Sequence, residues 1–336
     1  MRSIHEIMNA QYYEKPSWIL LLLPISFIYF LIISLRSWAY KVGILKVIKM
    51  DIPVVVIGNI TMGGTGKTPL VIWLLEKLIK LGMKPGLICR GYNSKANSPQ
   101  EVFTISEVSN VGDESLMVKL RLDIPVFVGK NKAKVGKRLL KSYPNVNILI
   151  SDDGLQHLQL SRDFEIVVVD GVRRFGNEHL IPAGPLREKI SRVGKVDALV
   201  INGSTKKSLS ESRVVSQYEM ACHGNILINS LYSDRISDLS TIRYEKEIIA
   251  VTAIGNPERF FEKLTNKGLK FQKKIFNDHH LFNEWDFKDY DDMTIIMTEK
   301  DAVKCRSFVK ENFWFLPIDA VVDEKLFKKL IKKLRI

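Results

Sequence analysis

The stretch from residue 61 to residue 68 constrains the fold more than any other part of the chain. It reads Thr-Met-Gly-Gly-Thr-Gly-Lys-Thr and matches the phosphate-loop pattern G-x-x-x-x-G-K-[ST] except at its first position, where Thr61 replaces glycine. A β-branched run at 53–57 precedes it, and a helical apolar pattern over 68–81 follows and ends at Gly82. The motif therefore lies between a buried strand and a helix, which is the context that a phosphate loop requires.

We expect this loop to hold the phosphates of a nucleotide. Its three glycines allow backbone N–H groups to point at a polyphosphate. Lys67 is expected to reach the β- and γ-phosphates, and the hydroxyl of Thr68 is expected to bind Mg²⁺. The predicted nucleotide-binding residues are Thr61, Met62, Gly63, Gly64, Thr65, Gly66, Lys67 and Thr68.

Short apolar runs alternate with helical patterns along the rest of the chain. This rhythm predicts an α/β protein with a doubly wound, mainly parallel sheet like that of the P-loop NTPases. The expected strands of this first domain are 86–89, 126–128, 148–150, 165–169 and 198–201. A surface loop is expected at 203–216, a linker strand at 226–231, and a second, smaller α/β domain with strands 248–252 and 294–298 and helices 257–266 and 324–334.

The segment 18–35 carries no charge over 18 residues, of which 13 are Ile, Leu or Phe. As a helix it would extend about 27 Å, just short of a ~30 Å hydrocarbon core. Four basic residues and no acid follow before residue 51, which places the rest of the chain in the cytoplasm by the positive-inside rule. Whether this membrane helix spans the bilayer or lies in one leaflet stays open, and a buried core helix is the alternative. The predicted organisation is an anchor with its basic flank (1–50), a P-loop domain (51–220) and a second α/β domain (221–336).

The formal net charge of +13 suits an anionic partner such as an acidic membrane surface or a phosphorylated substrate. No arginine-rich arm interleaved with aromatic residues is present, so we expect no nucleic-acid partner, and nothing indicates an obligate protein partner. The three cysteines are far apart and form no CxxC pair. This spacing fits a reducing compartment and excludes a disulfide framework or a zinc site.

Acidic residues mark a second part of the site. The run 147–153 ends in Asp152 and Asp153 at the carboxyl end of a predicted strand, where P-loop proteins hold Mg²⁺, although a polar turn would look the same. Asp113 and Glu114 stand at a predicted helix start, and composition alone favours a helix cap there. For His279, in the run Phe-Asn-Asp-His-His, composition alone likewise favours a structural histidine in a loop.

The chain resembles the tetraacyldisaccharide 4'-kinase family from the apolar segment almost to the C-terminus. Eight blocks in the family's order carry the resemblance: GNITMGGTGKTP (58–69), RGY (90–92), VGDE (111–114), DDGLQH (152–157), PAGPLRE (182–188), GNP (255–257), DH (278–279) and TEKDAVK (298–304). The resemblance implies ATP- and Mg²⁺-dependent phosphorylation of the 4'-hydroxyl of the tetraacyl disaccharide 1-phosphate, which gives lipid IVA. It also implies two α/β/α domains with the active site between them, at the inner membrane.

The same resemblance assigns roles by position. It makes Asp113 the catalytic aspartate and His279 its partner from the second domain, with His280 leaving open which imidazole acts. It places Glu114, Asp152 and Asp153 around magnesium and the nucleotide. The residues on the substrate side are then Gln156, His157, Arg187 and Glu188. Where the family has an arginine after a Val-Gly strand end, this chain reads Gly-Lys-Asn-Lys (129–132), so a phosphate contact there would come from a lysine.

Two rival functions remain open at this stage. A membrane-docked P-loop switch ATPase would carry a lysine where this chain has Met62, and the absence of that lysine argues against it. A cytosolic small-molecule kinase would bury the 18–35 helix in its core. A lipid acceptor explains best why a kinase carries an anchor, because the acyl chains stay in the bilayer while the headgroup reaches the site.

Overall fold

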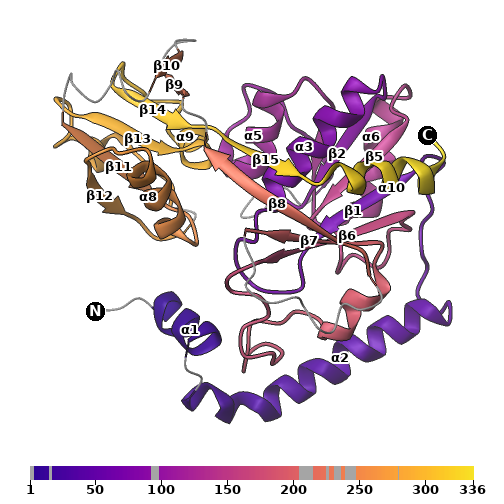
Figure 1. Ribbon diagram of the computed structural model, residues 1–336. Coiled ribbons are helices and arrows are strands. Elements are labelled where there is room, and N and C mark those ends of the chain that lie inside the picture. The colour runs from indigo at the N-terminus through magenta and orange to yellow at the C-terminus, as the bar shows by residue number, and fades with distance from the viewer. Residues whose placement is uncertain are drawn as a thin grey trace.

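The computed structural model describes residues 4–14, 17–91, 98–203, 215–224, 227–230, 236–238, 247–278 and 280–336. Two sheets form two lobes, and two long strands of the larger sheet extend toward the smaller one (Figure 1). The nine strands of the larger sheet are, in spatial order, β15 (Ile318–Val322), β8 (Gln217–Gly224), β7 (Ala198–Asn202), β6 (Phe164–Asp170), β1 (Val54–Gly58), β5 (Ile148–Asp152), β2 (Pro85–Cys89), β4 (Val126–Val128) and β3 (Gln100–Glu101).

The centre of the larger sheet is parallel and buried on both faces. Strand β1 pairs in parallel with β5 on one side and β6 on the other, and all five of its residues are buried. Continuous Val and Ile runs such as 54–57 suit this position because helices or loops cover each face. The chain order reverses on the two sides of β1, so ligands are expected beyond the carboxyl ends of β1, β5 and β6.

Helices cover both faces, which confirms the predicted doubly wound α/β fold. One core lies beneath α3 (Lys67–Lys80), α5 (Asp113–Arg121) and α10 (Glu324–Leu334). The other core lies beneath α6 (Lys132–Ser142) and the segment that follows β6, including the 3₁₀ helix η2 (Ile190–Lys195). The short helix α4 (Val108–Val111) leads into α5.

The smaller sheet has six strands: β10 (Ile236–Asp238), β9 (Leu227–Ser230), β14 (Phe313–Leu316), β13 (Thr294–Thr298), β11 (Ile248–Thr252) and β12 (Gln272–Ile275). Helix α8 (Pro257–Asn266) packs Phe260, Phe261 and Leu264 on one face. On the other face lie α9 (Glu299–Cys305) and the segment around the 3₁₀ helix η4 (Glu284–Phe287). This is the predicted second, smaller α/β unit.

The course of the chain between the lobes differs from the predicted segments. The residues predicted as a linker strand at 226–231 contribute β9, which belongs to the smaller sheet. Conversely, β15 and α10 leave the second lobe and return to the larger sheet, where β15 pairs antiparallel with β8 and Leu326 and Leu330 of α10 enter its core. The predicted surface loop at 203–216 lies almost entirely outside the described residues.

The N-terminal segment forms α1 (Ile4–Tyr13), the 3₁₀ helix η1 (Trp18–Leu22) and α2 (Leu23–Lys41). Together η1 and α2 form the single helical stretch of the described chain that is long and apolar enough to cross a membrane, with a mean hydropathy of 2.5 and 11% of the window buried. Helix α2 lies alongside the larger lobe rather than inside it (Figure 1). The interpretation of this segment as a buried core helix is therefore wrong.

Candidate active site

The phosphate loop joins β1 to α3 at the carboxyl edge of the larger sheet. Gly63 and Gly66 have φ angles of 91° and 89°, a region that side chains other than glycine rarely adopt. A Cβ on Gly66 would also lie 2.2 Å from Nδ2 of Asn202, which donates a hydrogen bond to the carbonyl of Thr65. Asn202 at the end of β7 thus fixes the loop from outside the motif, a role that the sequence pattern did not reveal.

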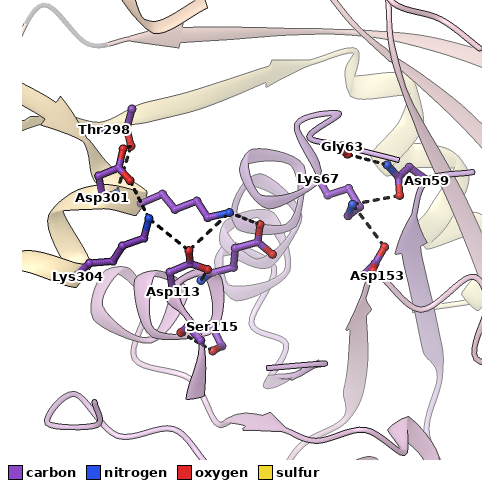
Figure 2. Close-up of polar contacts among 12 residues, drawn as sticks. Asn59, Gly63, Lys67, Asp113, Ser115, Asp153, Thr298, Asp301 and Lys304 are labelled. Atoms are coloured by element: carbon purple, nitrogen blue, oxygen red, sulfur yellow. Dashed lines mark hydrogen bonds and ion pairs between the residues drawn. The ribbon is translucent and has the colours of Figure 1, made fainter. Parts of the chain in front are cut away.

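Lys67, the first residue of α3, contacts two polar side chains at this edge of the sheet. Its Nζ donates to Oδ1 of Asn59 at 3.2 Å and lies 3.4 Å from Oδ1 of Asp153 (Figure 2). The amide of Asn59 in turn donates to the carbonyl of Gly63 at 3.2 Å. The side chain of Asn59 therefore aligns both the lysine and the glycine turn.

Asp152 and Asp153 lie where predicted, at the end of β5, and their environments differ. Burial, together with the nearby Glu114 carboxylate, raises the pKa of Asp152 to about 7 despite the opposing effect of Lys67. Burial also disfavours the charged form of Asp153, but Lys67 and Arg187 outweigh it and hold the pKa of Asp153 well below its ordinary value. Asp153 is thus held in its charged form, whereas a bound cation would favour the charged form of Asp152.

The donor set at this edge fits a magnesium ion that is shared with a nucleotide. The buried Oδ1 of Asp152 has no hydrogen-bond partner among the described residues, and the hydroxyl-bearing Thr68 stands one residue after Lys67. In the described part of the chain no three His, Cys, Asp or Glu side chains converge as a closed metal site. Mg²⁺ matches such a site because it commonly binds one or two carboxylates together with substrate phosphates and water.

Asp113 and Glu114 open α5, as predicted, but the helix cap is Gly112 and no side chain caps the helix. Asp113 is 5% exposed, and its Oδ1 accepts a hydrogen bond from the backbone N–H of Glu114. Its Oδ2 faces the second lobe, 3.7 Å from Nζ of Lys300 and 3.8 Å from Nζ of Lys304 (Figure 2). The carboxylate therefore points across the lobe boundary, which a simple capping role would not require.

The two lysines belong to the block TEKDAVK, for which the sequence predicted no role. Lys300 donates to Oε1 of Glu114 at 3.1 Å. Lys304 is buried and pairs with Asp301 at 2.9 Å. Asp301 also accepts hydrogen bonds from Thr298 and Thr252, which anchors the start of α9 on the second sheet.

The predicted partner of Asp113, His279, lies outside the described residues. Its two neighbours are described. Asp278 is close enough to raise the pKa of Lys300, together with the larger effects of Glu114 and Asp113 that overcome the opposing effect of burial. His280 is engaged within its own lobe, where Nε2 lies 3.0 Å from Oδ2 of Asp286 and the ring stacks on Phe276. These contacts leave His279 as the better candidate for the imidazole that acts.

The predicted substrate-side residues form a chain of contacts beside the phosphate loop. Gln156 donates to Oε1 of Glu188 at 2.6 Å and to the carbonyl of Asn59 at 3.2 Å. Arg187 forms an ion pair with Asp153 at 3.3 Å, and its carbonyl accepts a hydrogen bond from the hydroxyl of Tyr29 on α2. Helix α2 is therefore connected through one residue to a predicted magnesium carboxylate.

His157 lies next to this chain of contacts and is half-buried. Burial and the positive charges of Lys132 and Arg90 lower the pKa of His157 to about 4. Its imidazole is therefore neutral at physiological pH, and in this state it can donate or accept a hydrogen bond without adding charge.

Lys132 does not take the position of a phosphate-binding residue. Its side chain is 1% exposed, and Nζ donates to the carbonyls of Ile88 at 2.9 Å and Asp152 at 2.5 Å. This lysine of the run 129–132 joins the carboxyl ends of β2 and β5 instead. It fixes the backbone that carries Asp152.

A further cation near the phosphate loop was not predicted. Arg173 follows β6, and its Nη1 would lie 3.8 Å from a Cβ built on Gly63. Its guanidinium covers the ring of Tyr13 on α1, whose hydroxyl donates to the carbonyl of Met62 at 3.1 Å. Its Nη2 donates to the carbonyl of Gly255 in the second lobe at 3.4 Å. Arg173 therefore contacts the N-terminal helix and the second lobe beside the phosphate loop.

Known proteins share both the sequence and the architecture. The sequence model of the family described as tetraacyldisaccharide-1-P 4'-kinase matches residues 18–335. A tetraacyldisaccharide 4'-kinase from Methylobacillus flagellatus is 40% identical over 99% of this chain and 97% of its own length. One from Nitrosococcus oceani is 44% identical over 93% of this chain and 89% of its own length.

Among solved structures, the chain is similar to LpxK from Aquifex aeolicus, determined in complex with ATP. The TM-score is 0.78 at 27% sequence identity, over 95% of this chain and 99% of the other. The likeness thus extends over nearly the whole chain. With a match of this extent in sequence and in structure, the chain belongs to the tetraacyldisaccharide-1-P 4'-kinase family.

Proposed function

We propose that this protein transfers the γ-phosphoryl group of ATP to the 4'-hydroxyl of the tetraacyl disaccharide 1-phosphate precursor of lipid A, giving lipid IVA. The observation that carries this proposal is the position of Lys67, held 3.4 Å from Asp153 at the carboxyl edge of the larger sheet. Family membership supplies the acceptor, since the relatives are tetraacyldisaccharide 4'-kinases. Phosphoryl transfer needs positioning and neutralisation of charge more than covalent chemistry from the protein.

In this reaction the phosphate loop binds the nucleotide through its backbone N–H groups and Lys67. Thr68, Glu114, Asp152 and Asp153 would hold Mg²⁺, which supplies charge neutralisation on the phosphate oxygens when bound. Asp113 accepts the proton of the acceptor hydroxyl, and His279 orients that carboxylate or tunes its pKa. The two lobes contribute to one reaction because Asp113 belongs to the larger lobe and His279 to the smaller.

The acceptor headgroup is expected beside Gln156, Arg187 and Glu188. Support comes from the hydrogen bonds and ion pairs that join these residues to Asn59 and Asp153 next to the phosphate loop. Support also comes from α2, whose Tyr29 donates to the carbonyl of Arg187. A lipid that enters along α2 would therefore present its sugar to the phosphate loop.

We further propose that α2 lies in one leaflet, with its axis along the membrane surface. Ser26, Tyr29 and Arg36 all contact the larger lobe, so the helix is attached along its length and does not project away from the protein. The side chains of this helical stretch that do not face the lobe are apolar and exposed, among them Leu21, Ile25, Ile28, Ile32 and Leu35. A helix that the protein holds along its length and that is apolar over its exposed surface can lie within one leaflet beside the protein.

The membrane in question would be the inner membrane, with both lobes on the cytoplasmic side. The basic residues Arg36, Lys41, Lys46 and Lys49 support this side and would meet anionic headgroups. Neither a nucleic acid nor an obligate protein partner is required for the proposed reaction. The lipid acceptor would reach the site from the leaflet in which α2 lies.

The decisive experiment incubates the purified full chain with labelled ATP, Mg²⁺ and tetraacyl disaccharide 1-phosphate in mixed micelles. Labelled lipid IVA is the expected product, and the label should be absent when the acceptor lacks its 4'-hydroxyl. Steady ATP hydrolysis that is independent of lipid, with no labelled lipid, would instead support the switch ATPase. The variant Lys67→Ala serves as the control for a contaminating kinase.

A further inference from the structure

Lys300 lies at the junction of the two lobes, and its partners are carboxylates that belong to the other lobe. Its Nζ is 3.1 Å from Oε1 of Glu114 and 3.7 Å from Oδ2 of Asp113. Its side chain retains 20% of its exposure, so it is not sealed from solvent as that of Lys304 is, at 1%. A cation from the second lobe therefore already contacts both a predicted magnesium residue and the predicted catalytic aspartate.

Lys304, one helical turn further on, provides an instructive contrast. Its side chain is 1% exposed and pairs with Asp301 of the same helix at 2.9 Å. Asp301 is itself held by Thr298, Thr252 and the backbone N–H of Ala253. Lys304 is thus held mainly within its own lobe, although its Nζ also lies 3.8 Å from Oδ2 of Asp113. The carboxylate partners of Lys300, in the first turn of α9, belong to the other lobe.

We propose that Lys300 is an exchangeable counter-ion: it occupies the Glu114 carboxylate until Mg²⁺ takes that oxygen, and it then turns to the phosphoryl group that is being transferred. This inference rests on the proposed kinase function and adds a role for a residue of the second lobe. If Glu114 held Mg²⁺, the lysine and the metal would compete for the same carboxylate, because both are cations that need close contact with it. The released ammonium remains near Asp113, where the acceptor hydroxyl and the γ-phosphate must meet.

Electrostatics favours such an exchange. Asp113, Glu114 and Asp152 place negative charge close together before the metal binds, and a cation on Glu114 reduces their repulsion. A lysine suits the task because its compact charge is carried on a flexible four-carbon stem. After the exchange, Mg²⁺ and Lys300 would neutralise different oxygens of the same transfer, as cationic groups do in other phosphoryl-transfer enzymes.

The test measures metal affinity separately from turnover. Mn²⁺ is titrated into the full-length protein in detergent with saturating ADP, and free Mn²⁺ is followed by electron paramagnetic resonance. Removal of the competing charge in Lys300→Met should tighten Mn²⁺ binding by about 3- to 10-fold. The same variant should lose about 10²-fold in kcat, because one fixed cation is missing from the transition state.

Opposite signs for metal affinity and turnover are the signature of exchange. Mn²⁺ binding that is unchanged or weaker in Lys300→Met would overturn the proposal and leave Lys300 as a structural link between the lobes. In a Glu114→Gln background the exchange predicts no effect of Lys300→Met on Mn²⁺ affinity, and a persistent tightening there would also contradict it. Lys310→Met is the matched control, since it removes the same charge from an exposed ion pair with Asp291 on the same lobe.

These measurements separate this inference from the proposed function. If the wild-type chain fails to phosphorylate the lipid, the proposed function is wrong, whatever the metal titration shows. If the wild type phosphorylates the lipid and Lys300→Met binds Mn²⁺ no more tightly, the exchange alone is wrong. The Lys300→Arg variant checks folding, because it keeps the charge and should keep Mn²⁺ affinity near that of the wild type.

Discussion

Lys67 and Asn59 are eight residues apart in the sequence, whereas Lys300 and Glu114 are separated by 186, yet both pairs lie in the same site. The first pair belongs to one strand–loop–helix unit whose geometry is set by the local backbone. The second pair forms where α9 of the smaller lobe meets α5 of the larger lobe. We refer to these as the phosphate-loop half and the carboxylate half of the site.

The two halves should respond differently to perturbation. The phosphate-loop half is attached to one rigid sheet, so we expect it to bind nucleotide in any arrangement of the lobes. The carboxylate half depends on the contact between the lobes, which Arg121 of α5 extends by pairing with Glu299 of α9. Changes in the phosphate-loop half should therefore affect nucleotide binding and turnover together. Changes in the carboxylate half should affect mainly turnover and leave nucleotide binding nearly unchanged.

The largest effect is expected in the phosphate-loop half. Lys67→Ala removes the fixed counter-charge of the β- and γ-phosphates and should lower kcat by about 10³-fold or more. It should also leave the Asp153 carboxylate without its lysine partner, and a less neutralised negative charge beside the phosphates should weaken ATP binding. Transfer to the lipid and equilibrium binding of ATP are the two measurements. Near-normal kcat would contradict the assignment of the phosphate loop.

In the carboxylate half, Asp113→Ala should lower kcat by about 10²–10⁴-fold, the usual range for loss of a general base, and leave ATP affinity largely unchanged. Single-turnover transfer and ATP binding measure the two quantities. An unchanged kcat would restore the helix-cap interpretation, although the position of the carboxylate beside Lys300 argues against it.

The partnership with His279 can be tested in the same assay. His279→Ala alone should cost less than Asp113→Ala, and the double variant should lose less than the product of the two single losses if the residues act as a unit. Fully multiplicative losses would show that they do not share a proton path. His280→Ala is the matched control, because His280 is occupied by Asp286 within its own lobe.

The same difference between the halves decides what the sequence could predict. The phosphate loop and the acidic end of β5 were predicted because their function lies in consecutive residues with a regular strand before them. The bounds of β11, β13, α8 and α10 also agree with the predicted ranges, since each is a strongly patterned run. Local propensity and periodicity contain this information.

Contacts between distant segments could not be predicted in this way. Nothing in the run 318–322 distinguishes a strand of the smaller sheet from β15, whose antiparallel pairing with β8 is decided by packing in the larger sheet. The burial of Lys132 and the reach of Lys300 to Glu114 likewise depend on the folded arrangement. A lysine has the same local pattern whether it lies in a core, on a surface or in a site.

A smaller effect is expected from the exposed apolar side chains of α2, which is connected to the site without being part of either half. Replacing Ile25, Ile28 and Ile32 by serine removes exposed apolar side chains and leaves the contacts of Ser26 and Tyr29 in place. Transfer to lipid in liposomes should fall by about 10-fold, because the site is no longer held at the surface. In detergent micelles the deficit should shrink.

Deleting residues 1–35 is a harsher version of this test. The sequence alone predicted that ATP binding would survive it, because the phosphate loop begins well beyond the deletion. The structure predicts some loss of ATP affinity, because the deletion removes Tyr13, whose hydroxyl donates to the carbonyl of Met62 in the phosphate loop and whose ring lies under the Arg173 guanidinium. Weaker ATP binding after deletion but not after the serine replacements would assign that loss to Tyr13. Full activity of both variants on liposomes would show that the anchor is dispensable.

The smallest effect concerns stability and pH at His157, next to the phosphate-loop half. Because burial and nearby cations lower its pKa to about 4, the folded state resists protonation that the unfolded state accepts near pH 6.5. Between these two values the unfolded chain binds more protons, so this histidine makes stability rise with pH from about 4 to about 6.5. The His157→Gln variant should lack this contribution.

Between pH 7.5 and pH 5 the free energy of unfolding should therefore fall by about 1–2 kcal/mol more in the wild type than in the variant. This range allows for solvent screening of a half-buried ring. Urea denaturation at the two pH values measures the difference, and the variant cancels the opposite contribution of Asp152, whose raised pKa stabilises the folded state as pH falls. Equal pH dependence in both proteins would mean that the imidazole is protonated as readily in the folded chain as in the unfolded one, and that neither burial nor the charges of Lys132 and Arg90 lower its pKa.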